Sequence, residues 1–552
     1  MIDIGAAEAW AEALGLAPAP LFGADDREVV GTHVVLLDGG SGSIAMSSCN
    51  DEIWHETTPA AWAWSSDIPH HLTITDTKVA VTRWDMPRQP SVYDRSSVER
   101  GFERFYAFLI NDRLRSNKTV VEHLLNLFRR LRSLSHASGL ADSRATDVFG
   151  AILAEMIAPE EAKDHPQNFG LKADAFELTA QLDSRGVAAT LEEFGCASGS
   201  LAALKLYPGL AVRHAAGQLF QEAHFELLRA PSSADLFGLI GMPETAVVTR
   251  GGTYFTPPPL ARTVVEQAID AAPELLNQAE LTICDPACGS GAFLHETLRA
   301  LRRSGYDGLV RLIGQDQSAS AVSMAEFVLR TSLRDWSPAG GVALTLETGD
   351  SLGELGIPEA DVVLMNPPFI SFGSQSSSQR HQLKEAVGST GAARGDYSMA
   401  FVTRALESLK PGGVLGTLFP ASLLSLKAAA EWREMLLNAG EIRFLGSIGE
   451  FGLFAHAMVQ VACAVIRKKG AKPNSEFTAL VTQNDPAATS EALRWLRKTT
   501  RKSMPQSITE TGWALFPVST ESLSGRTTWR LISPESDRAL RAILDMQLPT
   551  IG

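Results

Sequence analysis

Residues 281–293 read LTICDPACGSGAF, and this stretch decides the fold. The apolar run LTIC predicts a short buried strand, and the segment FLHETLRAL that follows the stretch predicts a helix. Between them, Gly289 and Gly291 let the backbone approach a ligand closely, and the N-terminus of the helix offers free N–H donors. A lone Gly-x-Gly also fits dinucleotide sites and ordinary tight turns, so the neighbouring segments must decide what this loop is.

Strands and helices alternate around this loop, from residue 281 to residue 468. Further apolar strands are RLIGQD, VALTLETGD, DVVLM and GGVLGTLFP, and the segments SASAVSMAEFVLRTSL and YSMAFVTRALESL predict helices. Alternation of this kind predicts a parallel, doubly wound α/β sheet. In such sheets ligands bind outside the carboxyl ends of the strands.

Acidic residues stand at these strand ends. Asp285 follows the first strand, Asp316 ends the second and Asp350 follows the third. An acid at the end of the second strand is well placed to accept hydrogen bonds from ribose hydroxyls. The alternative for Asp316 and Asp350 is that each caps the helix that follows.

A rigid polar loop, Asn366-Pro367-Pro368-Phe369, follows the strand DVVLM. The two prolines stiffen the backbone and remove two N–H donors. What remains is a set of hydrogen-bond acceptors beside an aromatic ring, which suits an exocyclic amino group on a flat base. The alternative is a rigid loop with a buried Phe369.

Together these strings resemble those of S-adenosylmethionine-dependent N6-adenine DNA methyltransferases. DPACGSGAF is similar to the cofactor box of that family, and NPPF is similar to its catalytic box. Upstream, residues 252–257 (GTYFTP) with Leu260 and Ala261 resemble the box that precedes the cofactor loop in the gamma-ordered class. That order is typical of modification subunits of type I restriction–modification systems and of related type II enzymes. The resemblance covers roughly residues 205–470.

The resemblance implies a Rossmann-like methyltransferase core and a role for individual residues. It implies that S-adenosylmethionine is held by Tyr254, Thr256, Asp285, Ala287, Gly289, Gly291, Asp316 and Asp350. Of these, Asp316 would hold the ribose and Asp350 the adenine amino group of the cofactor. The catalytic residues would be Asn366, Pro367, Pro368 and Phe369. Asn366 and Pro367 would accept the two hydrogens of the target amine, and Phe369 and Phe454 would stack on the target base.

Composition limits the class of protein. The chain has five cysteines, too few for a disulfide scaffold, and Cys284 and Cys288 have no matching Cys/His pair downstream, so no metal is expected. No apolar run reaches the ~18 residues of a membrane span, and the acidic N-terminus is a poor signal peptide. These features predict a soluble cytoplasmic protein with no membrane partner.

The net charge of −14 argues against a protein that only coats nucleic acid. DNA binding would then depend on a local basic patch or on a partner. Residues 95–132 carry nine basic and four acidic side chains, which favours either a solvated helical face or a phosphate-contacting surface. A second basic cluster would either serve DNA or the partner, or lie on a solvated helix. It comprises Arg494, Arg497, Lys498, Arg501 and Lys502.

The pattern along the chain predicts four domains. Residues 1–94 are β-rich and of unknown role, residues 95–245 are helical, residues 246–470 form the methyltransferase domain, and residues 471–552 form a C-terminal extension. No GxxxxGK[ST] string and no clear nuclease cluster occur. Because little sequence follows the core, we expect target recognition to come from a separate specificity subunit or from a segment lost by truncation.

These observations predict an adenine-specific DNA methyltransferase that acts on double-stranded DNA in a restriction–modification or anti-phage defence system. One alternative is a protein-glutamine or RNA methyltransferase, because Asn-Pro-Pro-aromatic boxes also occur there. Another is a catalytically silent DNA-binding scaffold of a defence complex. Cofactor turnover, and the substrate that acquires the methyl group, separate the three.

Overall fold

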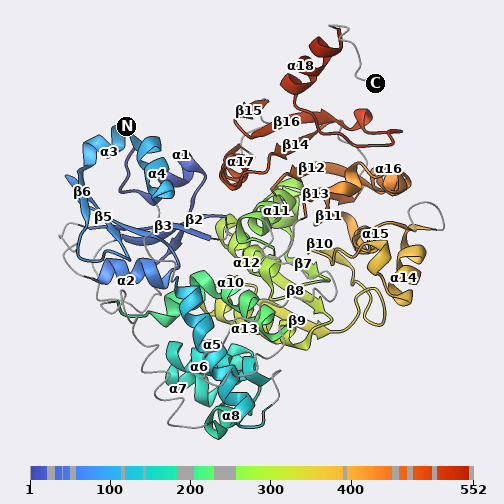
Figure 1. Ribbon diagram of the computed structural model, residues 1–552. Coiled ribbons are helices and arrows are strands. Elements are labelled where there is room, and N and C mark those ends of the chain that lie inside the picture. The colour runs from blue at the N-terminus through green and yellow to red at the C-terminus, as the bar shows by residue number, and fades with distance from the viewer. Residues whose placement is uncertain are drawn as a thin grey trace, which may run out of the picture. The chain divides into compact units, whose positions relative to one another are not determined.

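Figure 1 shows the computed structural model of the 552-residue chain. The structure describes residues 2–21, 32–39, 41–49, 57–112, 119–140, 144–182, 204–228, 256–388, 394–450, 459–468, 476–499 and 507–545. The chain divides into two compact units. The first comprises Met1–Val248, Gly289–His295 and Ala319–Ser337, and the second comprises Thr249–Cys288, Glu296–Ser318 and Pro338–Gly552.

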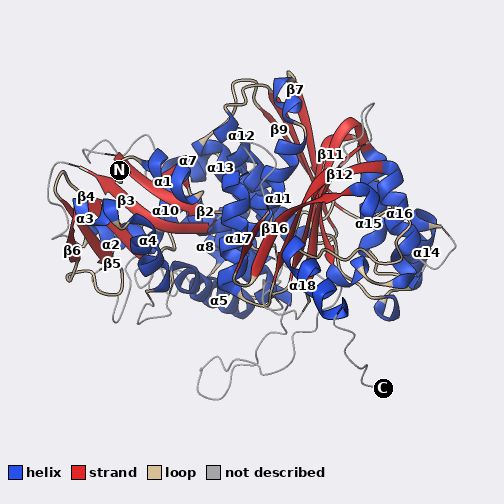
Figure 2. Ribbon diagram, turned by 90° about the horizontal axis from the view of Figure 1, so that it is seen from above, coloured by secondary structure: helices blue, strands red, loops and turns tan. Residues whose placement is uncertain are grey.

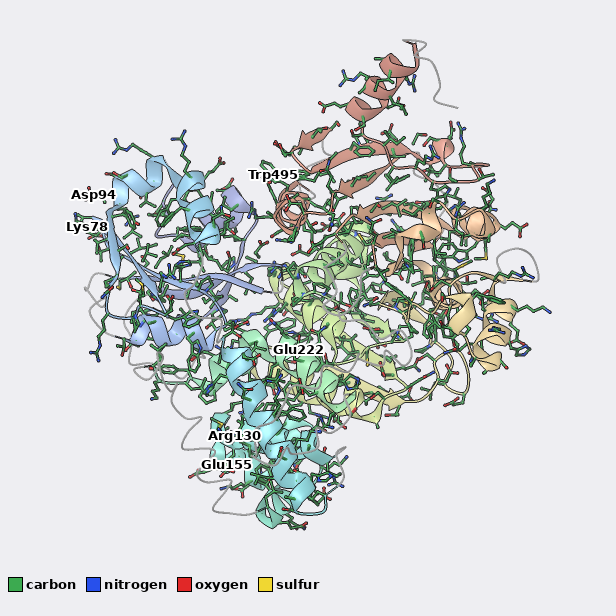
Figure 3. The ribbon with its side chains drawn as sticks, in the orientation of Figure 1. Lys78, Asp94, Arg130, Glu155, Glu222 and Trp495 are labelled. Atoms are coloured by element: carbon green, nitrogen blue, oxygen red, sulfur yellow. The ribbon has the colours of Figure 1, made fainter. Side chains whose placement is uncertain are left out.

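The first unit contains a six-stranded sheet, which agrees with the β-rich N-terminal region expected from the sequence. Its strands lie in chain order: β1 (Ala17–Pro20), β2 (Thr32–Asp38), β3 (Ser41–Ser48), β4 (His70–Ile74), β5 (Lys78–Arg83) and β6 (Ser91–Asp94). Neighbouring strands are antiparallel except β3 and β4, which are parallel and joined through α2 (Thr58–Ser65). At the β6 edge, Lys78 and Asp94 form an exposed ion pair of 2.7 Å (Figure 3).

This small sheet buries a chain of polar side chains. The Ser47 Oγ lies 2.6 Å from His33 Nδ1 and 2.9 Å from His71 Nε2, and Thr73 Oγ1 lies 3.5 Å from His71 Nδ1. Trp62 of α2 packs edge-on against the His33 ring. Ser47 and His71 have no exposed surface. Burial lowers the pKa of His71 to about 3, so its imidazole is neutral at physiological pH.

Helices form the rest of the first unit, as their apolar spacing predicts. They are α1 (Ala7–Leu14), α3 (Arg95–Arg100), α4 (Phe102–Asn111), α5 (Val120–Ala137), α6 (Ala145–Ile157), α7 (Pro159–Asp164), α8 (Ala175–Gln181), α10 (Pro208–Leu228) and α13 (Ala319–Asp335). A row of aromatic rings joins four of them, with centroid distances of 5.2 Å for Phe128–Phe149, 5.7 Å for Phe149–Phe220 and 5.0 Å for Phe220–Phe327. These helices therefore share one apolar core.

The basic stretch at residues 95–132 is partly neutralised inside this unit. Arg95 pairs with Glu99 at 2.8 Å, and Arg129 pairs with Glu226 at 2.9 Å. Glu226 belongs to α10, far outside the stretch in which the charges were counted. The fold thus holds these two arginines in ion pairs, which argues against a phosphate contact for them. Three further basic residues of the stretch lie outside the described residues: Arg113, Arg115 and Lys118.

The second unit is built on a ten-stranded sheet in the order β15-β16-β14-β12-β13-β11-β10-β7-β8-β9. The strands are β7 (Glu280–Asp285), β8 (Leu309–Asp316), β9 (Val342–Thr348), β10 (Ala360–Met365), β11 (Leu409–Pro420), β12 (Gly440–Ile448), β13 (Val461–Lys468), β14 (Glu476–Thr482), β15 (Ile508–Glu510) and β16 (Trp513–Ser519). Strands β9, β8, β7, β10 and β11 are parallel to one another, as predicted. Strand β13 is antiparallel to both of its neighbours.

Helices cover both faces of this sheet (Figure 2). On one side lie α11 (Pro258–Ala271) and α17 (Pro486–Thr499), and on the other α14 (Ser377–Val387), α15 (Ser398–Ser408) and α16 (Ala430–Ala439). Alternation along β11 explains the division: Gly416 faces Val264 of α11, whereas its neighbour Leu415 belongs to the core with α15 and α16. The absence of a side chain at Gly416 lets α11 approach closely, because a Cβ there would lie 2.8 Å from Val264.

The sheet continues past residue 470. Strand β14 pairs in parallel with β12, and β16 pairs with β14, so the C-terminal extension shares the sheet of the predicted methyltransferase domain. Helix α17 is tied to α11 by Arg497, whose Nη1 donates to Thr263 Oγ1 at 3.3 Å. Arg497 is 7% exposed, so it faces neither solvent nor a partner, and both alternatives for the second basic cluster are wrong for this residue.

The last described helix is α18 (Pro534–Asp545). Its apolar side chains Leu540 and Ile543 are exposed. Among the residues that the structure describes, no helix is long and apolar enough to cross a membrane.

Candidate functional site

The predicted site residues of the second unit lie at one edge of its sheet. Asp285 and Asp316 end the parallel strands β7 and β8, Asp350 follows β9, and Asn366 follows β10. The strand register brings these ends together: Cys284 pairs with Ile313 of β8 and with Val363 of β10. Apolar runs that end in a polar residue therefore located the carboxyl edge of the sheet correctly.

Asp285 is the most deeply buried of these acids, with 1% of its surface exposed. Its Oδ1 accepts a hydrogen bond from the backbone N–H of Ala287 at 3.1 Å. Burial raises the pKa of the Asp285 carboxyl well above its ordinary range, and the negative charge of Asp316 raises it further. Two acids from neighbouring strands thus lie close enough to repel, and a bound cation or hydrogen-bond donor would relieve that repulsion.

The glycines of the loop have the backbone conformation for which glycine is needed. Gly289 has φ of 52° and Gly291 has φ of 85°, both in the left-handed region. A Cβ on Gly289 would meet no atom of the described residues within 4 Å, whereas a Cβ on Gly291 would lie 3.3 Å from the Ala325 Cβ. Gly289 thus leaves open space beside the backbone, and Gly291 permits close packing.

Two hydrogen bonds, one from the turn after β9 and one to β8, hold the first part of the loop. The buried Ser351 hydroxyl donates to the Pro286 carbonyl at 2.6 Å, and the Cys288 N–H donates to the Gln315 carbonyl at 2.9 Å. Sequence reasoning missed Ser351. Its position directly after Asp350 was the available signal, because the end of a neighbouring parallel strand reaches the same edge of the sheet.

Asp350 stands in a turn rather than at a helix cap. Its Oδ1 accepts from the Leu352 N–H at 3.0 Å, and its carbonyl accepts from the Gly353 N–H at 3.0 Å. The second carboxylate oxygen, Oδ2, accepts from Nε2 of Gln382 at 2.7 Å. Asp350 is half-buried. Each oxygen keeps a further lone pair for a donor such as an amino group.

The Asn366 loop follows β10, which lies between β7 and β11. Asn366 is half-buried with its Oδ1 atom fully enclosed, and Pro367 and Phe369 are buried. The loop therefore presents a carboxamide oxygen inside the protein at the carboxyl edge of the sheet. This is an arrangement that can accept hydrogen bonds from an amino group shielded from water.

The other predicted site residues precede or follow these motifs in the sequence. Thr256 is 6% exposed and directly precedes Pro257, which caps α11. Tyr254 and Phe454 lie outside the described residues. Cys284 and Cys288 are buried, and burial raises the pKa of both thiols. In the described ranges, no group of three or more His, Cys, Asp or Glu side chains is arranged to hold a metal.

A comparison with known proteins relates this part of the chain to one family. The family model of the N-6 DNA Methylases matches residues 239–511, which include the glycine loop, the three strand-end acids and the Asn366 loop. The match agrees with the resemblance that the motifs indicated.

Two curated relatives match over part of their length. Type II methyltransferase M.BanIII of Aneurinibacillus aneurinilyticus is 24% identical over 259 residues, 44% of this chain and 44% of that protein. Type II methyltransferase M.TthHB8I of Thermus thermophilus is 27% identical over 290 residues, 49% of this chain and 56% of that protein. The chain thus spans about half the length of the curated relatives it matches.

The fold is also shared with a solved structure. The cryo-EM structure of a DrdV–DNA complex has a TM-score of 0.50 and 13% identity, covering 96% of this chain and 58% of that chain. At this identity the likeness concerns the fold alone. Together with the strand order, it confirms the Rossmann-like core expected from the sequence.

Proposed function

We propose that the chain is an adenine-specific DNA methyltransferase that transfers a methyl group from S-adenosylmethionine to the N6 atom of adenine. The observation that carries the proposal is the Asn366 loop at the end of β10, beside the end of β7 that carries Asp285. The family match over residues 239–511 supports it. The names of the two relatives support a place in a restriction–modification or anti-phage defence system.

The residues at the sheet edge fit S-adenosylmethionine. The open space beside Gly289 would admit a ligand close to the backbone, and the carboxylates of Asp316 and Asp350 suit ribose hydroxyls and an adenine amino group. When bound, this cofactor supplies an electrophilic methyl group on a sulfonium. We assign its binding to Tyr254, Thr256, Asp285, Ala287, Gly289, Gly291, Asp316 and Asp350.

The Asn366 loop would prepare the amine of the target base. The carboxamide oxygen of Asn366 and the carbonyl of Pro367 are acceptors, and each would take one hydrogen of the N6 amine. An adenine amine is a poor nucleophile because its lone pair is delocalised into the ring. Two acceptors on a rigid Pro-Pro backbone would pull the amine out of the ring plane and localise that lone pair. Burial strengthens both hydrogen bonds, because water does not compete.

A base in a duplex cannot reach an acceptor buried as Asn366 Oδ1 is, so the target adenine would have to leave the helix. Flipping costs a few kcal/mol, which stacking on aromatic rings would partly offset. Phe369 would supply one ring and Phe454 the other. Recognition of the DNA sequence would come from a further segment or a specificity subunit, which agrees with the net charge of −14.

The test is methyl transfer from labelled S-adenosylmethionine to genomic DNA that lacks this modification, with and without gene-neighbour partners. Asn366→Ala should lower the rate by about 100- to 1000-fold, the usual cost of removing one acceptor or donor from a buried reaction site, and should leave cofactor binding unchanged. Asn277→Ala, an exposed asparagine at the opposite end of β7, is the matched control and should keep full activity.

The product decides between the candidate functions. Label in N6-methyladenine that is lost in Asn366→Ala supports the proposal. Label in protein or RNA would show that this molecule, and not DNA, is the substrate. Cofactor binding without any label, with every partner present, would favour the silent scaffold.

A further inference from the structure

A chain of hydrogen bonds runs from Asp350 to the segment behind the Asn366 loop. Gln382 of α14 donates from Nε2 to Oδ2 of Asp350 at 2.7 Å. Its Oε1 accepts from the phenol O–H of Tyr397 at 2.6 Å. The backbone N–H of Tyr397 donates in turn to the carbonyl of Ile370 at 2.9 Å, and Ile370 directly follows Phe369.

The chemistry of the groups allows one direction for this chain. A carboxylate only accepts hydrogen bonds, so Gln382 must present its NH₂ group to Asp350 and its oxygen to Tyr397. The phenol then acts as a donor. Tyr397 is 2% exposed, so water does not compete for its hydroxyl. The phenol therefore sets the orientation of the glutamine amide, and the amide sets that of the carboxylate.

At the Ile370 end of this series of hydrogen bonds, both the backbone N–H and the backbone carbonyl of Ile370 are bonded to side chains. The Asp396 carboxylate accepts from the Ile370 N–H, and the buried Gln375 donates from Nε2 to the Ile370 carbonyl at 2.9 Å. Asp396 is half-buried, and burial raises the pKa of its carboxyl. The segment that leaves the Asn366 loop is therefore held by residues just before α14 and α15.

The Asp350 end of the series is also held by a hydrogen bond. Ser351, next to Asp350, donates to the Pro286 carbonyl of the glycine loop at 2.6 Å. One hydrogen-bonded assembly thus connects the loop after β7, the turn after β9 and the loop after β10. The links join residues 65, 32 and 15 positions apart in the chain.

We propose that Gln382 and Tyr397 are positioning residues, which hold the Asp350 carboxylate in a set orientation relative to the Asn366 loop. The adenine end of the cofactor and the acceptors for the target amine are then aligned by one assembly. This inference rests on the proposed function, because it uses the role assigned there to Asp350. Neither Gln382 nor Tyr397 touches the reacting atoms; each acts through Asp350.

The decisive variant is Gln382→Glu, which replaces the donor by a second carboxylate facing Asp350. Two facing carboxylates repel when both are ionised and share a proton when the pH falls. With the full-length chain and S-adenosylhomocysteine as the calorimetric probe, Kd should rise about 10-fold at pH 8, the usual effect of losing a hydrogen bond to a charged group. At pH 6 it should return to within about 3-fold of wild type, because a protonated Glu can again donate.

Matched controls test the same chemistry at the opposite edge of the sheet. Gln278→Glu adds the same charge just before β7, where the side chain is exposed, and should bind the probe like wild type at both pH values. Tyr397→Phe should raise the KM for S-adenosylmethionine several-fold with a smaller change in kcat. Tyr306→Phe, which removes a buried phenol bonded to the Gln278 carbonyl, should change neither.

The two positioning residues should also act as a unit, so the double variant Gln382→Leu/Tyr397→Phe should cost no more than Gln382→Leu alone. Wild-type affinity of Gln382→Glu at pH 8, or a loss that does not recover at pH 6, overturns the inference. These outcomes are read from binding and stand apart from the proposed function. A wild-type chain that binds the probe but labels no DNA contradicts the function, whereas normal DNA methylation with insensitive variants contradicts only the positioning role.

Discussion

The two sheets of this protein both carry polar side chains, but the clusters differ in place and burial. In the six-stranded sheet, the half-buried His33 and the fully buried Ser47 and His71 lie on the strands themselves, beside Trp62, and are joined by hydrogen bonds. The ten-stranded sheet carries half-buried polar residues such as Asp350 and Asn366 just beyond its strand ends. The first arrangement satisfies polar groups internally, and the second leaves capacity for a ligand.

A change in a polar cluster should therefore have different effects in the two units. In the small sheet, the polar groups are part of the packing, so changing them should cost stability. At the edge of the large sheet, the polar side chains lie in loops. Changing them should therefore weaken ligand binding more than it lowers stability. Four predictions test this difference.

The largest stability effect should come from Ser47→Ala. This change removes hydrogen bonds to the imidazoles of His33 and His71, of which His71 is fully buried, and losses of this kind cost about 2–3 kcal/mol. Hydrogen exchange of the β2, β3 and β4 amides should accelerate accordingly. Ser91→Ala, an exposed serine on β6, is the control and should leave exchange unchanged. Equal protection in Ser47→Ala and wild type would show that this cluster does not stabilise the sheet.

Acid should act with opposite sign on the contributions of His71 and Asp285 to stability. The pKa of His71 falls from 6.5 to about 3 on folding. Between these two values, His71 is protonated in the unfolded chain and neutral in the native state. Stability of the small sheet is therefore lost as the pH falls through 6.5, by about 2 kcal/mol at pH 5. The raised pKa of Asp285 works the other way: the native state binds the proton more readily than the unfolded chain, so this carboxyl contributes stability as the pH falls.

The measurement compares wild type with His71→Gln at pH 7 and pH 5. The comparison is needed because the small-sheet unit also contains Asp67, whose pKa burial raises to about 7, an effect opposite in sign. Thermal unfolding of wild type should lose more stability on acidification than unfolding of the variant. Identical pH dependence in the two proteins would contradict the assignment to His71.

At the large sheet, Ser351→Ala should weaken binding of S-adenosylhomocysteine by about 10-fold, because the glycine loop loses its bond from Ser351 to the Pro286 carbonyl. This corresponds to about 1.4 kcal/mol, within the range of a buried hydrogen bond. Isothermal titration of the full chain measures it. Ser408→Ala removes a similar hydroxyl–carbonyl bond at the other edge and should leave affinity unchanged. A stability loss with unchanged affinity would assign Ser351 to packing alone.

The smallest effect should come from Lys78→Ala. Its ion pair with Asp94 joins two strands of the small sheet as closely as the buried bonds do, at 2.7 Å, but both side chains are largely exposed. Exposed pairs contribute little to stability, because water screens the charges. Urea unfolding of this variant should match that of wild type. A loss of stability as large as that of Ser47→Ala would show that burial is not what separates the two kinds of contact.

Much of the candidate site was predictable from local pattern. Asp285, Asp316 and Asn366 each interrupt or follow an apolar run, and such an interruption marks the end of a buried strand wherever the strand lies in the sheet. The helices at residues 102–111 and 120–137 were likewise visible in their apolar spacing. The four-domain division and the roles of the site residues stay predictions.

Other features were not predictable because they depend on partners distant in the chain. Arg497 looked like part of a basic surface, yet it is buried against α11, since β14 and β16 extend the sheet and bring α17 onto its face. Ser351, Gln382 and Tyr397 belong to no motif, and their importance follows only from the groups they meet.

The sequence by itself determined the class of fold, the edge of the sheet where the polar loops gather, and the family resemblance, because these depend on periodicity and on short strings of residues. Only the tertiary structure decided which donor meets which acceptor. The order β9-β8-β7-β10-β11 differs from the order in the chain, and it brings Pro286, Asp350 and Ile370 to one edge. A hydrogen bond requires its two atoms within about 3 Å, and for residues far apart in the chain the packing of strands and helices sets that distance.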